Sequence, residues 1–227
     1  MCHLVYYRCM DRLKTFYEYF LDFLFPQSAS VEYIERMNVS ALTNTLPQAK
    51  EIKDERIVAL FDYKDKLVKD LVWELKYKGN RKIASKIAQI IVDVLEHELA
   101  ERSLFENFTH PLLVPIPIAN KRRRERGFNQ TEILGEEIMK LDTNNLFEYA
   151  PNVLTKTHYT ESQARTHATK RERDENLKNS MRADTLVVGR CVIILDDVTT
   201  SGATFSEAKR ALKEAGAKKF LCVAVAH

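Results

Sequence analysis

Two adjacent aspartates, Asp196 and Asp197, are the side chains of this sequence whose type and spacing point most directly to chemistry. Adjacent carboxylates can accept hydrogen bonds from vicinal hydroxyls or help to hold a hydrated Mg²⁺. After Val198, which belongs to the same loop, six residues are small or hydroxyl-bearing: Thr199, Thr200, Ser201, Gly202, Ala203 and Thr204. If a helix starts near Thr204, its free N–H groups and positive dipole end face this loop, which then suits a phosphate monoester. We therefore expect a sugar phosphate, with ribose hydroxyls at the aspartates and the 5′-phosphate in the loop.

Two other interpretations of the aspartate pair exist. A strand that ends in two aspartates also occurs where an aspartate accepts phosphate, as in receiver domains, but these have no phosphate loop directly after the pair. Alternatively, the aspartates could simply cap a loop. The whole string from Val192 to Thr204, "VIILDDVTTSGAT", is more specific than either half, so we favour the ribose-phosphate site.

Apolar strands that alternate with amphipathic helices must position this pair. Strands are predicted at 56–63, 111–118, 152–155, 187–195 and 220–226, and helices at 64–79, 81–102, 129–141 and 206–219. Strands without polar alternation, separated by helices, predict an α/β fold with a parallel sheet covered on both faces. Ligands of such sheets bind beyond the carboxyl ends of the strands, where the aspartates follow the strand "VIIL".

The chain divides into an N-terminal extension at 1–55 and a main domain at 56–227. Apolar residues recur at helical spacing in the extension: Leu13, Phe16, Tyr17, Phe20, Leu21 and Leu24. We expect this helix to dock on the main domain, and a protein partner, a second copy of the chain or a membrane surface are alternatives. Residues 27–55 are polar and irregular, and we expect a linker or a peripheral segment there.

The composition is that of an ordinary globular protein. The chain has 227 residues and a net charge of +3, which is too small to imply a polyanionic partner by itself. No apolar stretch is long enough to span a membrane, and no secretion signal precedes the domain. The four cysteines do not form a disulfide framework, so we expect a cytoplasmic protein with reduced thiols.

A basic run at 121–126, "KRRRER", precedes the motif "GFNQ". The run follows a strand that ends at Pro115–Pro117 and is predicted to form a turn. Its cations could meet a pyrophosphate or a polyanion, or form a solvated surface. Arg126 is the strongest candidate because it abuts Gly127, which allows close backbone approach, while Asn129 could cap the next helix.

Two further segments leave alternatives open. The polar stretch at 157–176 is either disordered or a mobile lid, and we expect its His158 and His167 to be surface residues. Lys76, in "LKYKGN" at 75–80, either faces the site or is a helix-surface charge.

The aspartate string resembles the phosphoribosyl pyrophosphate (PRPP) signature of type I phosphoribosyltransferases. With "LKYKGN", "RGFNQ" and the stretch at 156–181, roughly residues 56–227 resemble the ComF-like (competence protein F) branch of that family. The resemblance implies a Rossmann-like sheet, a Mg²⁺–PRPP donor and a small hood over the site. It also implies transfer of the phosphoribosyl group to an unknown acceptor, with release of pyrophosphate. The implied catalytic residues are Asp196, Asp197 and Arg126.

The resemblance also assigns further site residues. It places a pyrophosphate-binding turn at Ile116, Pro117 and Ile118. It places a flexible loop that closes over PRPP at Gln163, Lys170 and Arg173. The alternative function is that of a non-enzymatic DNA-uptake factor, which would use the same fold to sense nucleotides or to bind single-stranded DNA through the basic run.

One feature departs from this family. Its members often carry a four-cysteine zinc module after a helix ending in a "LLFP"-like string. Here "DFLFP" at 22–26 is followed by no cysteine, and Cys2, His3 and Cys9 are poorly spaced for a metal. We therefore expect that this chain has lost the zinc module.

Overall fold

The computed structural model describes residues 29–50, 52, 54–156 and 179–227. The chain forms two compact units, Met1–Met37 and Asn38–His227. The first contains helix α2 (Ala29–Arg36). The apolar helix predicted at 13–24 lies outside the described residues, as do Cys2, His3 and Cys9.

The second unit begins upstream of the predicted domain start at 56. Helix α3 (Val39–Thr45) is capped by Asn38, whose side chain accepts a hydrogen bond from the Ala41 N–H at 2.8 Å. Its Leu42 is fully buried, and α3 packs against α5 (Arg81–Glu106). The prediction of an irregular linker at 27–55 was therefore wrong for the segments that form α2 and α3. Buried apolar residues in these short helices outweigh their polar neighbours.

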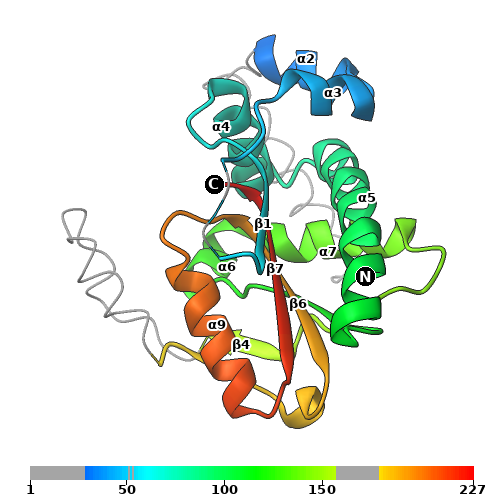
Figure 1. Ribbon diagram of the computed structural model, residues 1–227. Helices are drawn as coiled ribbons and strands as arrows, with labels where there is room; N and C mark the ends of the chain where they lie inside the picture. The colour runs from blue at the N-terminus through cyan, green and yellow to red at the C-terminus, as the bar shows by residue number, and fades with distance from the viewer. Residues whose placement is uncertain (1–28, 51, 53, 157–178) are drawn as a thin grey trace, which may run out of the picture. The chain divides into compact units, whose positions relative to one another are not determined.

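A parallel sheet forms the centre of the second unit (Figure 1). Its five strands lie in the order β1-β7-β6-β2-β3, and every neighbouring pair is parallel. The strands are β1 (Ile57–Phe61), β2 (Leu112–Pro115), β3 (Glu148–Tyr149), β6 (Cys191–Val198) and β7 (Lys219–Ala226). The predicted fold class, a parallel sheet flanked by helices, is confirmed.

Helices cover both faces of the sheet. On one face, Val192 and Ile194 of β6 share a buried cluster with Phe205 of α9 (Ala203–Glu214). The antiparallel pair β4 (Leu154–Lys156) and β5 (Met181–Ala183) completes this layer, and the short helix η3 (Thr185–Val187) follows it. On the other face, α7 (Gln130–Leu141) contacts β2 and β6 and packs on α5. Figure 1 shows α9 on one side of β6 and β7, with α5 and α7 on the other.

Local signals set the bounds of the two segments that carry motifs. Asp65 caps α4 (Lys66–Trp73) by accepting from two backbone N–H groups. The helix then widens into a π-helical turn, η1 (Glu74–Lys78), which ends at the left-handed Gly79. The basic run forms a helix, α6 (Asn120–Arg126), so the prediction of a turn there was wrong; charged residues other than aspartate favour helix.

The order in which the chain adds strands to the sheet reverses between β2 and β6. The chain passes from β2 through α7 to β3 on one side, and from β6 through α9 to β7 on the other. The loops after β2 and β6 therefore diverge at the carboxyl edge, and such switch points are where open α/β sheets bind ligands. Among the described residues, no helix has the length and apolar character needed to cross a bilayer.

Candidate functional site

The two aspartates lie at the switch point, in the last residues of β6. We expected the strand to stop just before them, but it continues through both to Val198. Asp196 and Asp197 are 7% and 5% exposed. Next to them, the N–H of Ile116 donates to the carbonyl of Leu195 at 2.8 Å. The predicted pyrophosphate turn that begins at Ile116 therefore lies beside the acid pair.

Asp197 is held by two side chains, one at each carboxylate oxygen. Nζ of Lys76, on η1, lies 3.4 Å from Oδ1 of Asp197. The amide Nε2 of Gln130, the first residue of α7, donates to Oδ2 at 2.7 Å. Of the two alternatives for Lys76, the structure therefore selects the one in which its side chain faces the site.

Asp196 is buried beside the charged carboxylate of Asp197. Burial raises its pKa well above the ordinary value for a carboxyl group, and the charge of Asp197 adds to this effect. Burial likewise lowers the pKa of Lys156 at the end of β4; the charge of Arg122 lowers it further, whereas that of Asp196 opposes the shift. Two lysines, Lys76 and Lys156, thus supply positive charge to the acid pair.

The predicted phosphate loop follows directly. Thr199 is buried, and its N–H donates to the carbonyl of Ala226 in β7 at 2.9 Å. Gly202 has a φ of 73°, a left-handed conformation that glycine adopts without strain. Helix α9 starts at Ala203 without a side-chain cap, so its first N–H groups are available to an anion at the loop. The loop and the aspartates thus extend from one strand toward the same edge.

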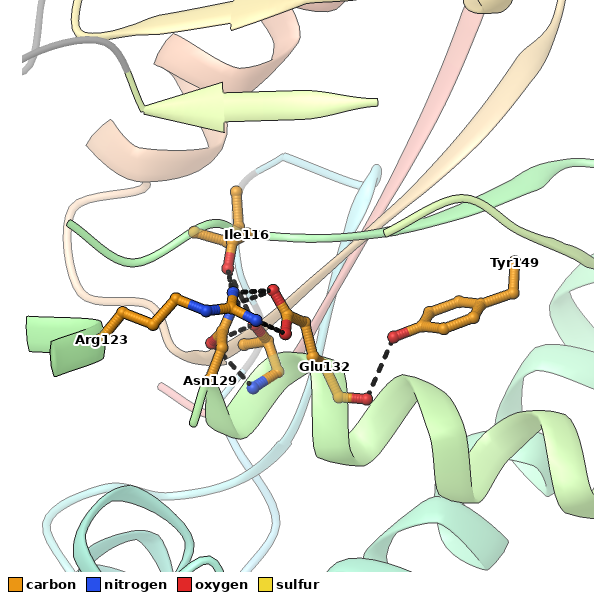
Figure 2. Close-up of polar contacts among 6 residues, drawn as sticks. Ile116, Arg123, Asn129, Glu132 and Tyr149 are labelled. Atoms are coloured by element: carbon orange, nitrogen blue, oxygen red, sulfur yellow. Dashed lines mark hydrogen bonds and ion pairs between the residues drawn. The ribbon is translucent and has the colours of Figure 1, made fainter. Parts of the chain in front are cut away.

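The motif "RGFNQ" contacts both the turn after β2, at Ile116 (Figure 2), and the acid pair. Asn129 caps α7, as predicted, because its Oδ1 accepts from the Thr131 N–H at 3.2 Å. Asn129 Nδ2 and Thr131 Oγ1 also both donate to the carbonyl of Ile116, at 3.0 and 2.8 Å. The start of α7 therefore contacts the turn after β2 through Asn129 and the acid pair through the next residue, Gln130.

A second layer of contacts orients this helix start. Arg123 of α6 donates two hydrogen bonds to the carboxylate of Glu132, at 2.6 and 2.9 Å (Figure 2). The hydroxyl of Tyr149 donates to the Glu132 carbonyl at 3.1 Å. Arg123 of the basic run thus has a structural role, because its guanidinium forms an ion pair with Glu132.

The motifs "LKYKG" and "RGFNQ" form one wall of the site. The guanidinium carbon of Arg126 lies 4.9 Å from the ring centroid of Tyr77. Arg126 also donates to Oε1 of Gln130 at 3.1 Å. Gly79 packs so closely on Phe128 that a Cβ atom there would lie 3.0 Å from its ring. These contacts explain in physical terms why a glycine follows the π-helical turn.

The structure brings together most of the predicted site residues. Asp196, Asp197, the segment at 116–118, the loop at 198–204 and Arg126 gather at one edge of the sheet, where Arg126 reaches Asp197 through Gln130. Three predicted residues lie outside the described part of the chain: Gln163, Lys170 and Arg173. His158 and His167 also lie outside it.

Sequence reasoning missed three residues of the site, namely Tyr77, Gln130 and Lys156. Tyr77 and Gln130 belong to the motifs "LKYKGN" and "RGFNQ", so these motifs marked the right segments although neither residue was given a role. Lys156 begins the stretch at 156–181 and is the last residue of β4, and its electrostatic interaction with Asp196 gives it significance.

The residues present suit a metal ion that arrives with a phosphate ligand. In the described part of the chain, no group of three histidine, cysteine or acidic side chains could hold a metal by itself. Two carboxylates whose oxygens already accept hydrogen bonds fit a hydrated Mg²⁺, which keeps several waters and binds substrate phosphates. Asp196 and Asp197 would hold such an ion through its waters.

Several known proteins are similar to this chain. The DNA utilization protein YhgH of Salmonella typhi is 31% identical over 166 residues, which cover 72% of this chain and 68% of that protein. Competence protein F of Haemophilus influenzae is 30% identical over 114 residues, 47% of this chain and 46% of that protein. No protein-family model matches. Glutamine PRPP amidotransferase from B. subtilis is 17% identical with a TM-score of 0.38, over 67% of this chain and 30% of that enzyme.

Proposed function

Because the chain belongs to the ComF-like family of the phosphoribosyltransferase fold, we propose that it binds PRPP and transfers the phosphoribosyl group to an acceptor. One observation carries this proposal. The acid pair, the turn after β2 and the phosphate loop lie at the same edge of the sheet, where the strand order reverses. A sugar bearing a 5′-phosphate and a pyrophosphate needs three such groups of contacts.

The expected chemistry is displacement at the anomeric carbon of the ribose. The lone pair of the acceptor forms a bond to this carbon, the bond to the pyrophosphate oxygen breaks, and pyrophosphate leaves with the electron pair. A proton lost by the acceptor passes to solvent or to pyrophosphate. Asp196 and Asp197 would accept hydrogen bonds from the ribose hydroxyls, and the first N–H groups of α9 would hold the 5′-phosphate.

Positioning and electrostatics would provide most of the rate enhancement. Mg²⁺ bound with PRPP would neutralise the charge of the pyrophosphate. Gln130 and Lys76 would fix Asp197 in one orientation before the donor arrives. Arg126 would contribute positive charge beside the acid pair, to which it is joined through Gln130.

Release of pyrophosphate tests this proposal. Wild-type protein with PRPP and Mg²⁺ should release pyrophosphate when an acceptor from a panel of bases and amines is added. The variant Asp197→Asn should release it at least about a hundredfold more slowly, because it loses a charge that the transition state requires. Release by wild type and variant at equal rates would rule out the assigned site.

A DNA-binding role without catalysis is a second candidate. It is favoured by the relatives' names, which refer to DNA utilization and competence, and by the exposed cations of α6. Binding to the phosphates of single-stranded DNA would weaken steeply as the salt concentration rises. DNA binding that persists in Asp196→Asn and Asp197→Asn, together with no pyrophosphate release, would favour this role.

A further inference from the structure

Two exposed aromatic side chains lie on the same helical segment as Lys76, which contacts Asp197, and they have no role in the proposed donor site. Trp73 and Tyr77 are 40% and 54% exposed, and their ring centroids lie 5.3 Å apart. Single exposed apolar residues are ordinary, but a contiguous aromatic pair next to a candidate site indicates a binding surface. We call Trp73, Tyr77 and Arg126 the aromatic wall.

The aromatic wall is connected to the acid pair in two ways, through Lys76 and through Gln130. Lys76 and Tyr77 are neighbours on the π-helical turn η1; Lys76 reaches Asp197, while the Tyr77 ring stays exposed. Such turns are rare, and many occur at functional sites. The Arg126 guanidinium lies over Tyr77 and connects through Gln130 to the same aspartate. A ring stacked on the wall would therefore lie next to a ribose held by Asp196 and Asp197.

The charges around the wall favour an anionic ligand. Helix α6, which supplies Arg126, has five cationic side chains and one acidic side chain among its seven residues. Arg123 is paired with Glu132, but Arg122 and Arg124 are exposed beside it. Aromatic faces bind planar rings, and a guanidinium binds carboxylate or phosphate. The two properties together select a planar ring that carries a negative charge.

From these contacts we infer that the aromatic wall is the acceptor subsite, and that the acceptor is a small heteroaromatic ring with an anionic substituent. The inference rests on the proposed function, because it assigns the second substrate of the same site. A small ring fits better than a polymer because the wall offers only two neighbouring rings. Each additional base of a strand would need a further stacking surface.

The fluorescence of Trp73 provides a direct test, because the chain has a single tryptophan. Nicotinate and nicotinamide are matched probes: they share a ring, and only nicotinate has a carboxylate. Each is titrated with and without PRPP and Mg²⁺, with excitation at a wavelength selective for tryptophan. We expect saturable quenching by nicotinate, with a Kd at least about tenfold below that of nicotinamide, since Arg126 discriminates between them.

Variants locate the effect. Tyr77→Ala should raise the nicotinate Kd at least about fivefold, whereas Tyr77→Phe, which keeps the ring, should stay within about twofold. Arg126→Gln should reduce the preference for nicotinate over nicotinamide. Phe105→Ala removes an aromatic ring that is 86% exposed near the end of α5 and should change nothing.

Three results would overturn the inference. They are no saturable quenching by either ring, an unchanged nicotinate Kd in Tyr77→Ala, and quenching by an oligothymidylate but not by thymidine monophosphate. The last would assign the wall to a nucleic acid strand. Calorimetry of PRPP separates the two proposals. If PRPP binds and nicotinate does not, only the acceptor subsite is wrong; if nicotinate binds and PRPP does not, the proposed transferase function is wrong and the ring site stands.

Discussion

Replacing Gln130 by methionine should both destabilise the fold and weaken donor binding. The change keeps the length of the side chain but removes the donor that meets Asp197 at 2.7 Å and the acceptor that meets Arg126 at 3.1 Å. A hydrogen bond to a charged group contributes about 1.5–3 kcal/mol. Asp197 would keep Lys76 as a partner, so it would not become an uncompensated buried charge. We therefore expect the free energy of unfolding to fall by about 2 kcal/mol.

The assay is urea unfolding followed by circular dichroism, with PRPP binding measured in parallel. If the freed Asp197 carboxylate must be reordered when the donor binds, a cost of about 1.4 kcal/mol would weaken PRPP binding about tenfold. Gln89→Met is the matched control. It removes one hydrogen bond, from Gln89 to Asp93 at 2.9 Å, between neighbouring turns of an exposed helix face, and should cost less than about 0.5 kcal/mol.

Two outcomes would refute this reasoning. If Gln130→Met unfolds at the same free energy as the control variant, the buried contact with Asp197 adds nothing to stability. If the variant is destabilised but binds PRPP as wild type does, Gln130 supports the fold without positioning the acid pair.

Three further predictions concern the rest of the second unit. Gly135→Ala should cost about 1–2 kcal/mol despite the better helix propensity of alanine, because the new Cβ would lie 2.6 Å from the Tyr149 ring; thermal unfolding would show an unchanged Tm if this close packing is absent. Burial raises the pKa of Glu207, but hydrogen bonds from Arg210 and a backbone N–H outweigh it and hold the pKa below the ordinary 4.5. The ionised Glu207 therefore contributes its full stabilisation above pH 4.5, and this contribution is lost as the pH falls through the lowered pKa. Glu207→Gln should flatten the acid limb of a curve of unfolding free energy against pH. An unchanged acid limb would contradict the assignment of this limb to Glu207. Burial raises the pKa of Cys222 to about 12, so mass spectrometry should find this thiol unmodified by iodoacetamide at pH 8 in the folded protein and modified in urea; equal labelling in both would be inconsistent with its burial.

The sequence predicted the sheet and the acid pair because both depend on local patterns. Strands β6 and β7 each contain an unbroken apolar run, at 192–195 and 220–226, that is buried on both faces, as a covered parallel sheet requires. Gly202 and the start of α9 also follow from short-range signals. The sequence alone therefore predicted that the candidate site lies at the carboxyl end of β6.

The partners of the acid pair could not be predicted in the same way. Gln130 and Asp197 are 67 positions apart in the chain, and no local pattern indicates that an amide on α7 reaches β6. Lys76 had two equal alternatives because a helix-surface lysine and a site lysine have the same sequence signature; the π-helical turn decides between them. Helix α6 was missed because four successive cations resemble a solvated turn, whereas Arg123 is anchored by Glu132.

The most direct test of the account is calorimetry of PRPP binding with and without Mg²⁺, on wild-type protein and on Asp197→Asn. The acid pair at the end of β6 and the loop before α9 predict saturable binding by wild type that is stronger with Mg²⁺, and a loss of at least about tenfold in affinity in the variant. No detectable binding by wild type, or equal binding by wild type and Asp197→Asn, would contradict the claim that this edge of the sheet holds the donor.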